Sequence, residues 1–447
     1  MQTRRYGYWR RTVAIVGAGL LTAVLATGWG TSASRRPDTA GRAGQPASHV
    51  MAGSDPARGT GVAVGSAPAA DLAADRAVRL QALLGQHSVL AADLMRSRIR
   101  GDDDFVQAAN GALARNTDAM TALVGQLFGK AAADTFGPMW SRHVVAVVDY
   151  AGAVADQDDD ARARAHEELV KDEVELADFF AAASRGRLSP DGARRAVSMH
   201  VEHLTKQADA YAAGDYATAD RIYREGYEHA YDLGLTLADA LLPPGDRSAL
   251  RAPVWRLRSQ LGKLLAEHVV LVQDVTRAAV ANSPDFDAAA AAINANTRAL
   301  ASAMDTLFGA AAAQEFQALW AQHVEQLVAY GAATAAGDAG RQQRARDGLR
   351  DFEQRMATFL GGATSGRMSG SDLSAALTAH DGMLVRHAEV YAARDYATAH
   401  DVARQTYDHM FDLARQLADA FGATVAARLP RGGTQAGYGG LADVVGR

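Results

Sequence analysis

Histidines at matched positions in two halves of the chain are the residues whose types and spacing could do chemistry. The matched pairs are His87 and His268, His143 and His323, His200 and His380, and His229 and His409. The first pair is separated by 181 residues and each of the others by 180 residues. Imidazole is a common ligand for zinc and copper, and it also binds haem iron. The pairing therefore suggests one histidine-centred metal site in each copy of a repeated unit.

Three further side chains extend the candidate ligand set. His203 follows His200 by three residues and shares its helical face, while Met383 occupies the matched place in the second copy. His387 lies seven residues after His380 and replaces a glutamine of the first copy. A set of histidine and methionine without any cysteine suits copper better than iron–sulfur chemistry, and zinc remains an alternative.

The histidines fall on long helical segments. We predict helices and no strand from the abundance of alanine and from apolar residues spaced at i, i+3 and i+4. The predicted helices end at the segments Gly-Asp, Phe-Gly and Leu-Ser-Pro. In the first copy the predicted helices span 71–100, 105–127, 131–155, 160–185, 189–213 and 215–241. Short connectors between long helices favour up-and-down packing. We predict an all-α protein with two tandem copies of an up-and-down bundle of about six helices each.

The repeat sets the predicted domain boundaries. The first bundle spans 71–242, a linker with two prolines spans 243–253, and the second bundle spans 254–426. Tyr211-Ala-Ala-Gly-Asp-Tyr-Ala-Thr-Ala219 returns as Tyr391-Ala-Ala-Arg-Asp-Tyr-Ala-Thr-Ala399, and a period of this length indicates duplication of a whole domain. Asp215 and Asp395 are expected to cap the helices that follow them. Residues 34–70 and 427–447 are rich in small residues and are predicted to be a flexible linker and a flexible tail.

Residues 1–33 have the pattern of an export signal. Four arginines precede an apolar run that ends near Trp29, and small residues follow up to Ala33. Cleavage after Ala33 is favoured, but the run approaches the roughly 20 residues that span a bilayer, so a transmembrane anchor is the alternative. Either way, the helical body is expected outside the cytoplasm, secreted or attached to the membrane only through this segment.

A metal site requires the histidines to converge. Each lies near the middle of its predicted helix, and the middles of antiparallel helices lie at one level of a bundle. Ring nitrogens within about 5 Å of one another would favour a metal, given metal–nitrogen bonds of about 2.0–2.1 Å. The alternative is structural, because duplication copies core residues too, and buried histidines can serve as interhelical hydrogen-bonding groups. Haem is a third and less favoured ligand.

Composition and missing motifs restrict the function. The formal net charge of −5 argues against binding to nucleic acid, whose phosphates would repel the protein. The absence of cysteine excludes disulfides and thiolate sites. No Glu-x-x-His pair, His-Glu-x-x-His, P-loop or Gly-x-Ser-x-Gly is present, so catalysis is not favoured and no catalytic residue is assigned. The expected partners are a metal ion and an envelope protein.

Four segments carry a family resemblance. They are His87-x-x-Leu90, Trp140-x-x-His143-Val144, Tyr211-Ala-Ala-Gly-Asp-Tyr216 and Tyr227-Glu-His229. Together they resemble a group of uncharacterised exported tandem helical-bundle proteins of Gram-positive bacteria, some of which bear the label copper amine oxidase. The resemblance implies copper as a candidate ligand. It implies no oxidase activity, because the quinone of those enzymes forms in an Asn-Tyr-Asp/Glu motif and this chain has no Asn-Tyr pair.

Overall fold

Helices account for nearly all of the described chain. The structure is a computed structural model that describes residues 69–242, 245 and 247–428. The predicted export signal, nearly all of the predicted linker and most of the predicted tail lie outside these residues. In the first copy the helices are α1 (Ala69–Arg100), α2 (Asp103–Phe128), α3 (Lys130–Asp156), α4 (Asp159–Ala183), α5 (Pro190–Ala212) and α6 (Tyr216–Leu241).

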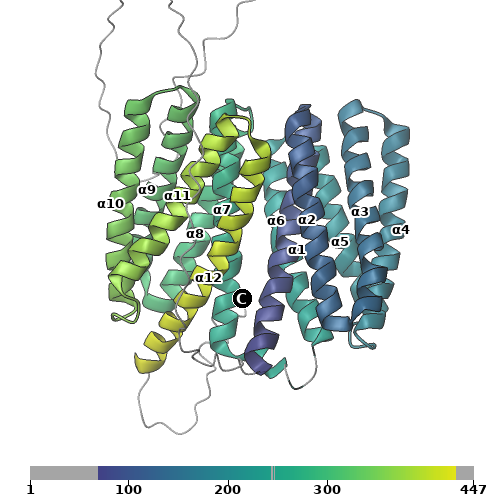
Figure 1. The fold of residues 1–447 in the computed structure, drawn as a ribbon, viewed down its shortest axis with the longest axis horizontal. Coiled ribbons are helices and arrows are strands. Elements are labelled where there is room, and N and C mark those ends of the chain that lie inside the picture. The colour runs from purple at the N-terminus through teal and green to yellow at the C-terminus, as the bar shows by residue number, and fades with distance from the viewer. Residues whose placement is uncertain (1–68, 243–244, 246, 429–447) are drawn as a thin grey trace, which may run out of the picture. The chain divides into compact units, whose positions relative to one another are not determined.

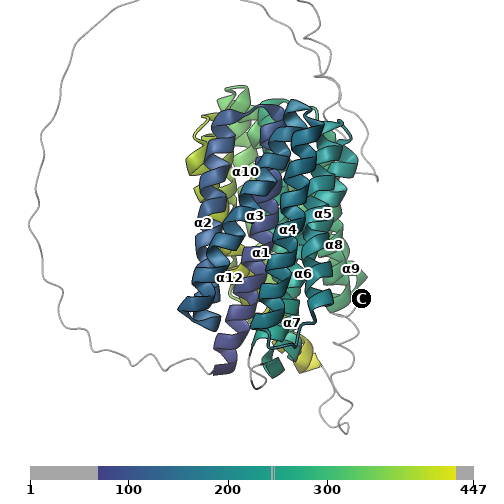
Figure 2. The ribbon, with the colours of Figure 1, turned by 90° about the vertical axis from the view of Figure 1, so that its right-hand side faces the viewer.

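The second copy repeats this order after a short 3-10 helix, η1 (Arg247–Arg251). Its helices are α7 (Pro253–Ala281), α8 (Phe286–Phe308), α9 (Ala310–Ala335), α10 (Ala339–Ala363), α11 (Gly370–Ala392) and α12 (Tyr396–Arg428). Figure 1 shows the helices of each copy lying side by side, and the turned view in Figure 2 brings α1 to α6 toward the viewer. The all-α prediction is confirmed, with twelve α-helices and no strand among the described residues.

Local signals determine where the helices begin. The side chains of Asp215 and Asp395 accept hydrogen bonds from the backbone amides of Thr218 and Thr398, as predicted, and so satisfy amides that have no partner inside the helix. Gly214, immediately before the first cap, has φ +76°, a conformation that glycine adopts without strain. Arg394 occupies the matched place in the second copy with φ +61°, so the turn is retained without its glycine.

The two copies pack against each other through equivalent contacts. The Tyr227 hydroxyl donates to the carbonyl of Lys263 at 3.1 Å, and the Tyr407 hydroxyl donates to the carbonyl of Ala82 at 3.1 Å. Tyr227 and Tyr407 occupy matched positions of the repeat, and so do Lys263 and Ala82. Each copy therefore donates an equivalent hydrogen bond to the other copy. One large cluster of buried apolar side chains runs through both copies. The repeated units therefore form one continuous core.

Candidate metal centres

Three helices of the first copy bring three histidines together. His87 lies on α1, His143 on α3 and His200 on α5, each near the middle of its helix. Helices of similar length that are joined by short connectors pack side by side, so their midpoints lie near one level of the bundle. The ring centroids are 5.4 Å apart for His87 and His143, 5.3 Å for His87 and His200, and 5.6 Å for His143 and His200. One nitrogen from each ring lies within 4.8 Å of the other two.

The rings of this first triad are buried and have no hydrogen-bonding partners. Their exposed fractions are 0% for His87, 1% for His143 and 6% for His200. Neither nitrogen of any of the three rings is hydrogen-bonded among the described residues. Buried polar groups in folded proteins are nearly always paired, and each unpaired group costs about 1–3 kcal/mol. Six unpaired nitrogens at one point therefore require an explanation.

Burial keeps these imidazoles neutral. It lowers the pKa of His143 to about 4, and it lowers the pKa of His87 and His200 well below the ordinary value, with neighbouring histidines adding to the effect. The neutral ring is the form that binds a metal, because protonation removes the lone pair. The triad is therefore free of competing protons at neutral pH.

The second copy builds a matching triad. His268 on α7, His323 on α9 and His380 on α11 have ring centroids 5.4–5.6 Å apart and are 0–1% exposed. The Nε2 atoms of His268 and His323 are 3.3 Å apart. Two nitrogens bound to one tetrahedral ion at about 2.05 Å would be separated by about 3.3 Å, so this pair already has the spacing of two ligands.

Tryptophan and aspartate distinguish the second triad from the first. The indole N–H of Trp320 donates to Nδ1 of His268 at 3.1 Å, whereas the indole N–H of Trp140 in the first copy has no partner. The Nδ1 atom of His323 lies 3.2 Å from a carboxyl oxygen of Asp381. Burial and the adjacent Glu353 raise the pKa of Asp381 well above its ordinary value. The first copy has Val201 in the matched place.

Indole can only donate, so it determines the protonation pattern of the second triad. Nδ1 of His268 must accept from Trp320, which leaves the His268 proton on Nε2, where it is donated to Nε2 of His323. The His323 proton is then on Nδ1 and faces Asp381. A metal bound at Nε2 of His268 would displace this proton. The second triad is therefore partly satisfied without a metal, whereas the first is not.

Space at the first triad limits what could bind there. A cavity of about 20 Å³ lies beside the triad and is lined by apolar side chains together with Trp140, His143 and His200, but not by His87. A site for one water needs roughly 10–15 Å³, so this cavity holds a single water or ion. Pockets for cofactors are on the order of 300 Å³ or more. Haem would require the surrounding helices to separate.

The other predicted ligands lie outside the triads. His229 on α6 has Nε2 2.8 Å from the carbonyl of Ala196, and its ring centroid is 5.5 Å from that of His203. His409 on α12 makes the matched contact, 3.3 Å from the carbonyl of Ala376. Met383 is partly buried on α11. His387 lines a different cavity, between the two copies.

Several residues that surround the triads were not among the sequence candidates. Trp140 and Trp320 have ring centroids 4.5 and 4.7 Å from His87 and His268, and Phe352 stacks on His323 at 4.4 Å. The tryptophans could have been found, because each precedes a triad histidine by three residues and therefore shares its face. Asp381 gives no such signal, because the residue next to a buried histidine ordinarily faces away from the shared stripe.

Comparisons with known proteins add no further evidence. No protein-family model, curated protein or solved structure matches this chain. Within the part of the chain that the structure describes, no helix combines the length and apolar character needed to cross a membrane. Function must therefore be argued from the site itself. Two buried histidine triads could hold a metal ion, and this is the chemistry that their geometry permits.

Proposed function

We propose that this protein is an exported, envelope-associated helical-bundle protein that binds a transition metal, copper or zinc, at one histidine triad in each copy, without catalysing a reaction. The observation that carries the proposal is the set of six buried ring nitrogens in the first triad with no protein partner. Three neutral imidazoles with one nitrogen each within 4.8 Å need only small side-chain movements to bind one ion.

The charge of the site favours a monovalent ion in the first copy. Three neutral imidazoles supply no negative charge, and the cost of placing an ion in a low-dielectric interior grows with the square of its charge. Copper(I) is monovalent, and it accepts three-coordinate nitrogen sites without a further ligand. The location outside the cytoplasm rests on the arginine-rich, apolar segment at residues 1–33.

The second triad is better prepared for a divalent ion once its hydrogen bonds are broken. A carboxylate beside the second ring nitrogen of a ligating histidine can accept its N–H and add negative charge, and Asp381 lies 3.2 Å from Nδ1 of His323. Because burial and Glu353 raise the pKa of Asp381, this carboxyl group would have to lose its proton when the ion binds. Zinc and copper(II) are the candidates for such a site. Because Trp320 must first release His268, we expect this centre to bind its ion more weakly than the first centre.

A structural role is the second candidate function, and one observation favours it. The bonds from Trp320 to His268 and from His268 to His323 connect α9 and α7 without a metal. Such a network would hold the second bundle in register and could serve a protein partner in the envelope. It does not account for the first triad, where the corresponding nitrogens are unpaired.

Elemental analysis of untagged, full-length protein tests the proposal. Protein stripped with a chelator, loaded separately with copper(I) under reducing conditions or with zinc, and then desalted should retain close to one ion per copy. His143→Ala should abolish retention in the first copy, His323→Ala in the second, and the double variant in both. His166→Ala is the matched control, because His166 is exposed on α4 and should change nothing. Wild-type protein that stays metal-free after loading would overturn the proposal.

A further inference from the structure

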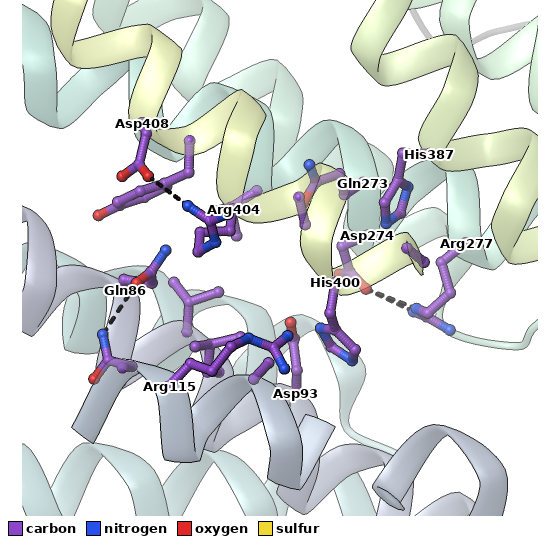
Figure 3. Close-up of a pocket in the computed structure, with 18 of the residues that line it drawn as sticks. Gln86, Asp93, Arg115, Gln273, Asp274, Arg277, His387, His400, Arg404 and Asp408 are labelled. Carbon is purple, nitrogen blue, oxygen red and sulfur yellow. Dashed lines mark hydrogen bonds and ion pairs between the residues drawn. The ribbon is translucent and has the colours of Figure 1, made fainter. Parts of the chain in front are cut away.

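A cavity between the two copies has no role in the proposed metal binding. Its volume is about 100 Å³, and residues of α1, α2, α7, α11 and α12 line it. One part of its wall is apolar, formed by Leu83, Val89, Leu90, Val270 and Tyr407. The other part is polar, and Figure 3 shows Asp93, Asp274, His387 and His400 there, contributed by four different helices.

Differences between the copies open this cavity. In the first copy, Arg96 donates to Gln207 at 2.8 Å and to Asp220 at 2.7 Å, and its guanidinium lies over the ring of Tyr223. The second copy has His387, His400 and Ala403 in the places of Gln207, Asp220 and Tyr223. A neutral histidine cannot replace the aspartate as the ion-pair partner of an arginine, and alanine leaves the space of the tyrosine ring empty.

The arginine of the second copy pairs elsewhere. Arg277 binds Asp274 at 2.8 Å and Asp285 at 2.6 Å. Arg96 also lies 3.8 Å from Asp274, so this carboxylate is shared by both arginines. Asp93, the counterpart of Asp274, makes no hydrogen bond or ion pair through its carboxyl group among the described residues, although it lines the cavity.

The buried charges around the cavity do not balance. Arg96 and Arg277 face four carboxyl groups, those of Asp93, Asp220, Asp274 and Asp285. Arg100, at the edge, adds one more positive charge but donates to Tyr211 and Ser97. One carboxyl group therefore has no arginine partner, and it is that of Asp93, which lines the cavity.

The arginines at the rim are already paired. Arg79 and Arg404 bind Asp408 at 3.3 and 3.2 Å, and Arg115 binds Asp401 at 3.0 Å. Arg79 and Arg404 share one carboxylate, so two of these three positive charges are offset and one remains in excess beside Asp408. Two imidazoles lie at the polar part of the cavity with exposed fractions of 8% for His387 and 6% for His400, and one nitrogen of each has no partner. Burial lowers the pKa of His387 to about 3 and that of His400 to about 4, so both rings can accept a hydrogen bond.

We propose that this cavity binds a small organic cation, a primary ammonium group on a short apolar body. An ammonium group has three N–H donors, which match the free carboxylate of Asp93 and the neutral imidazoles. The apolar part would lie against Leu83, Leu90 and Val270. A cavity of about 150 Å³ in another protein holds benzene, so a body on the order of four or five carbons fits this one. The proposal is independent of the metal centres.

Proton release gives a specific signature of this binding mode. Burial and the neighbouring Asp274 raise the pKa of Asp93 to about 7, so part of the population carries a proton at neutral pH. A bound ammonium group favours the ionised carboxylate and must displace that proton. The buffer takes up the released proton, so the observed heat of amine binding should depend on the ionisation enthalpy of the buffer. The slope of that dependence should correspond to the release of less than one proton per amine bound.

Calorimetric titration of metal-free, full-length protein with n-butylamine, butyrate and 1-butanol at neutral pH tests the proposal. The amine should bind, and the anion and the alcohol of the same length should bind at least about tenfold more weakly. Asp93→Asn should weaken amine binding by at least about tenfold, while Asp419→Asn, which changes an exposed aspartate on α12, should leave it unchanged.

A second variant keeps the test independent of the buried charge cluster. Ala403→Tyr leaves every charge in place and restores the tyrosine of the first copy, so it should fill the cavity and abolish amine binding. Butyrate binding as tightly as n-butylamine would overturn the proposal, because it would identify an anion site. An amine affinity that neither Asp93→Asn nor Ala403→Tyr changes, or no binding up to about 10 mM, would overturn it as well.

Discussion

Replacing His143 by leucine separates a metal ligand from a structural histidine. In the first triad, the His143 ring is 1% exposed and both of its nitrogens lack a partner. Leucine is apolar and has a similar volume, so the substitution removes two unpaired polar atoms without opening a large cavity. If the His143 ring stabilises the fold, the substitution should lower the free energy of unfolding of the metal-free protein. If the ring serves only to bind an ion, the substitution should not lower it.

The expected sign depends on whether metal is present. Each unpaired buried polar group costs about 1–3 kcal/mol, and repacking around leucine costs up to about 1.5 kcal/mol, so the metal-free variant should be as stable as wild type or about 1–2 kcal/mol more stable. Metal at about a thousand times its dissociation constant stabilises a single site by about 4 kcal/mol. With metal, wild type should therefore become the more stable protein.

Urea unfolding, followed by circular dichroism, provides the assay. Wild type, His143→Leu and the exposed control His166→Leu are compared in chelator and in copper(I). The order of the midpoints of wild type and His143→Leu should reverse between the two conditions, and the control should follow wild type in both. A His143→Leu variant that is about 2 kcal/mol or more less stable in chelator, with no response of wild type to metal, would show that the ring stabilises the fold.

Three further predictions follow from particular contacts. Asp381→Asn should weaken divalent metal binding at the second centre by about 10–100-fold and leave the first centre unchanged, measured by competition with a chromogenic chelator. Acid should destabilise the metal-free protein: because the folded pKa of His143 is about 4 and the unfolded value is about 6.5, only the unfolded chain takes up this proton as the pH falls between them. Each triad histidine of this kind removes up to about 1.4 kcal/mol per pH unit, so urea midpoints should fall steeply from about pH 6.5 downward, and constant midpoints to pH 5 would contradict the lowered pKa values. Gly234→Ala should lower the thermal midpoint by several degrees or prevent folding, because the new Cβ would lie 2.5 Å from the Cα of Gln81 and force α6 away from α1.

The sequence was sufficient to predict the helices. It also predicted that four histidines of each copy converge, and the structure brings three of the four together. Caps such as Asp215, glycines between helices and the apolar spacing are local signals, and they determine where each helix begins and which face is buried. His229 differs from the triad members in a way that its own helix indicates. It shares a face with Asp232 and Thr236, and in the structure it bonds to the carbonyl of Ala196 instead of joining the triad.

Contacts that depend on the packing between helices could not be predicted. Asp381 approaches His323 from α11, and no pattern within either helix specifies their separation of 3.2 Å. The cavity between the copies depends on how the two bundles dock, which a repeat offset of 180 residues does not determine. The hydrogen bonds from Tyr227 to Lys263 and from Tyr407 to Ala82 join the two copies, and neither bond can be inferred from one copy alone.

The two copies share some features of the candidate metal centres and differ in others. Both retain three histidines on alternate helices and a tryptophan against the first ring, and these features determine the position and the burial of the nitrogens. They differ in the groups that set charge and protonation: Val201 corresponds to Asp381, and the unpaired indole of Trp140 corresponds to the bonded indole of Trp320. Because metal preference depends on charge and on the free lone pair, one duplicated scaffold can present two centres that differ in the ion they bind and in how tightly they bind it.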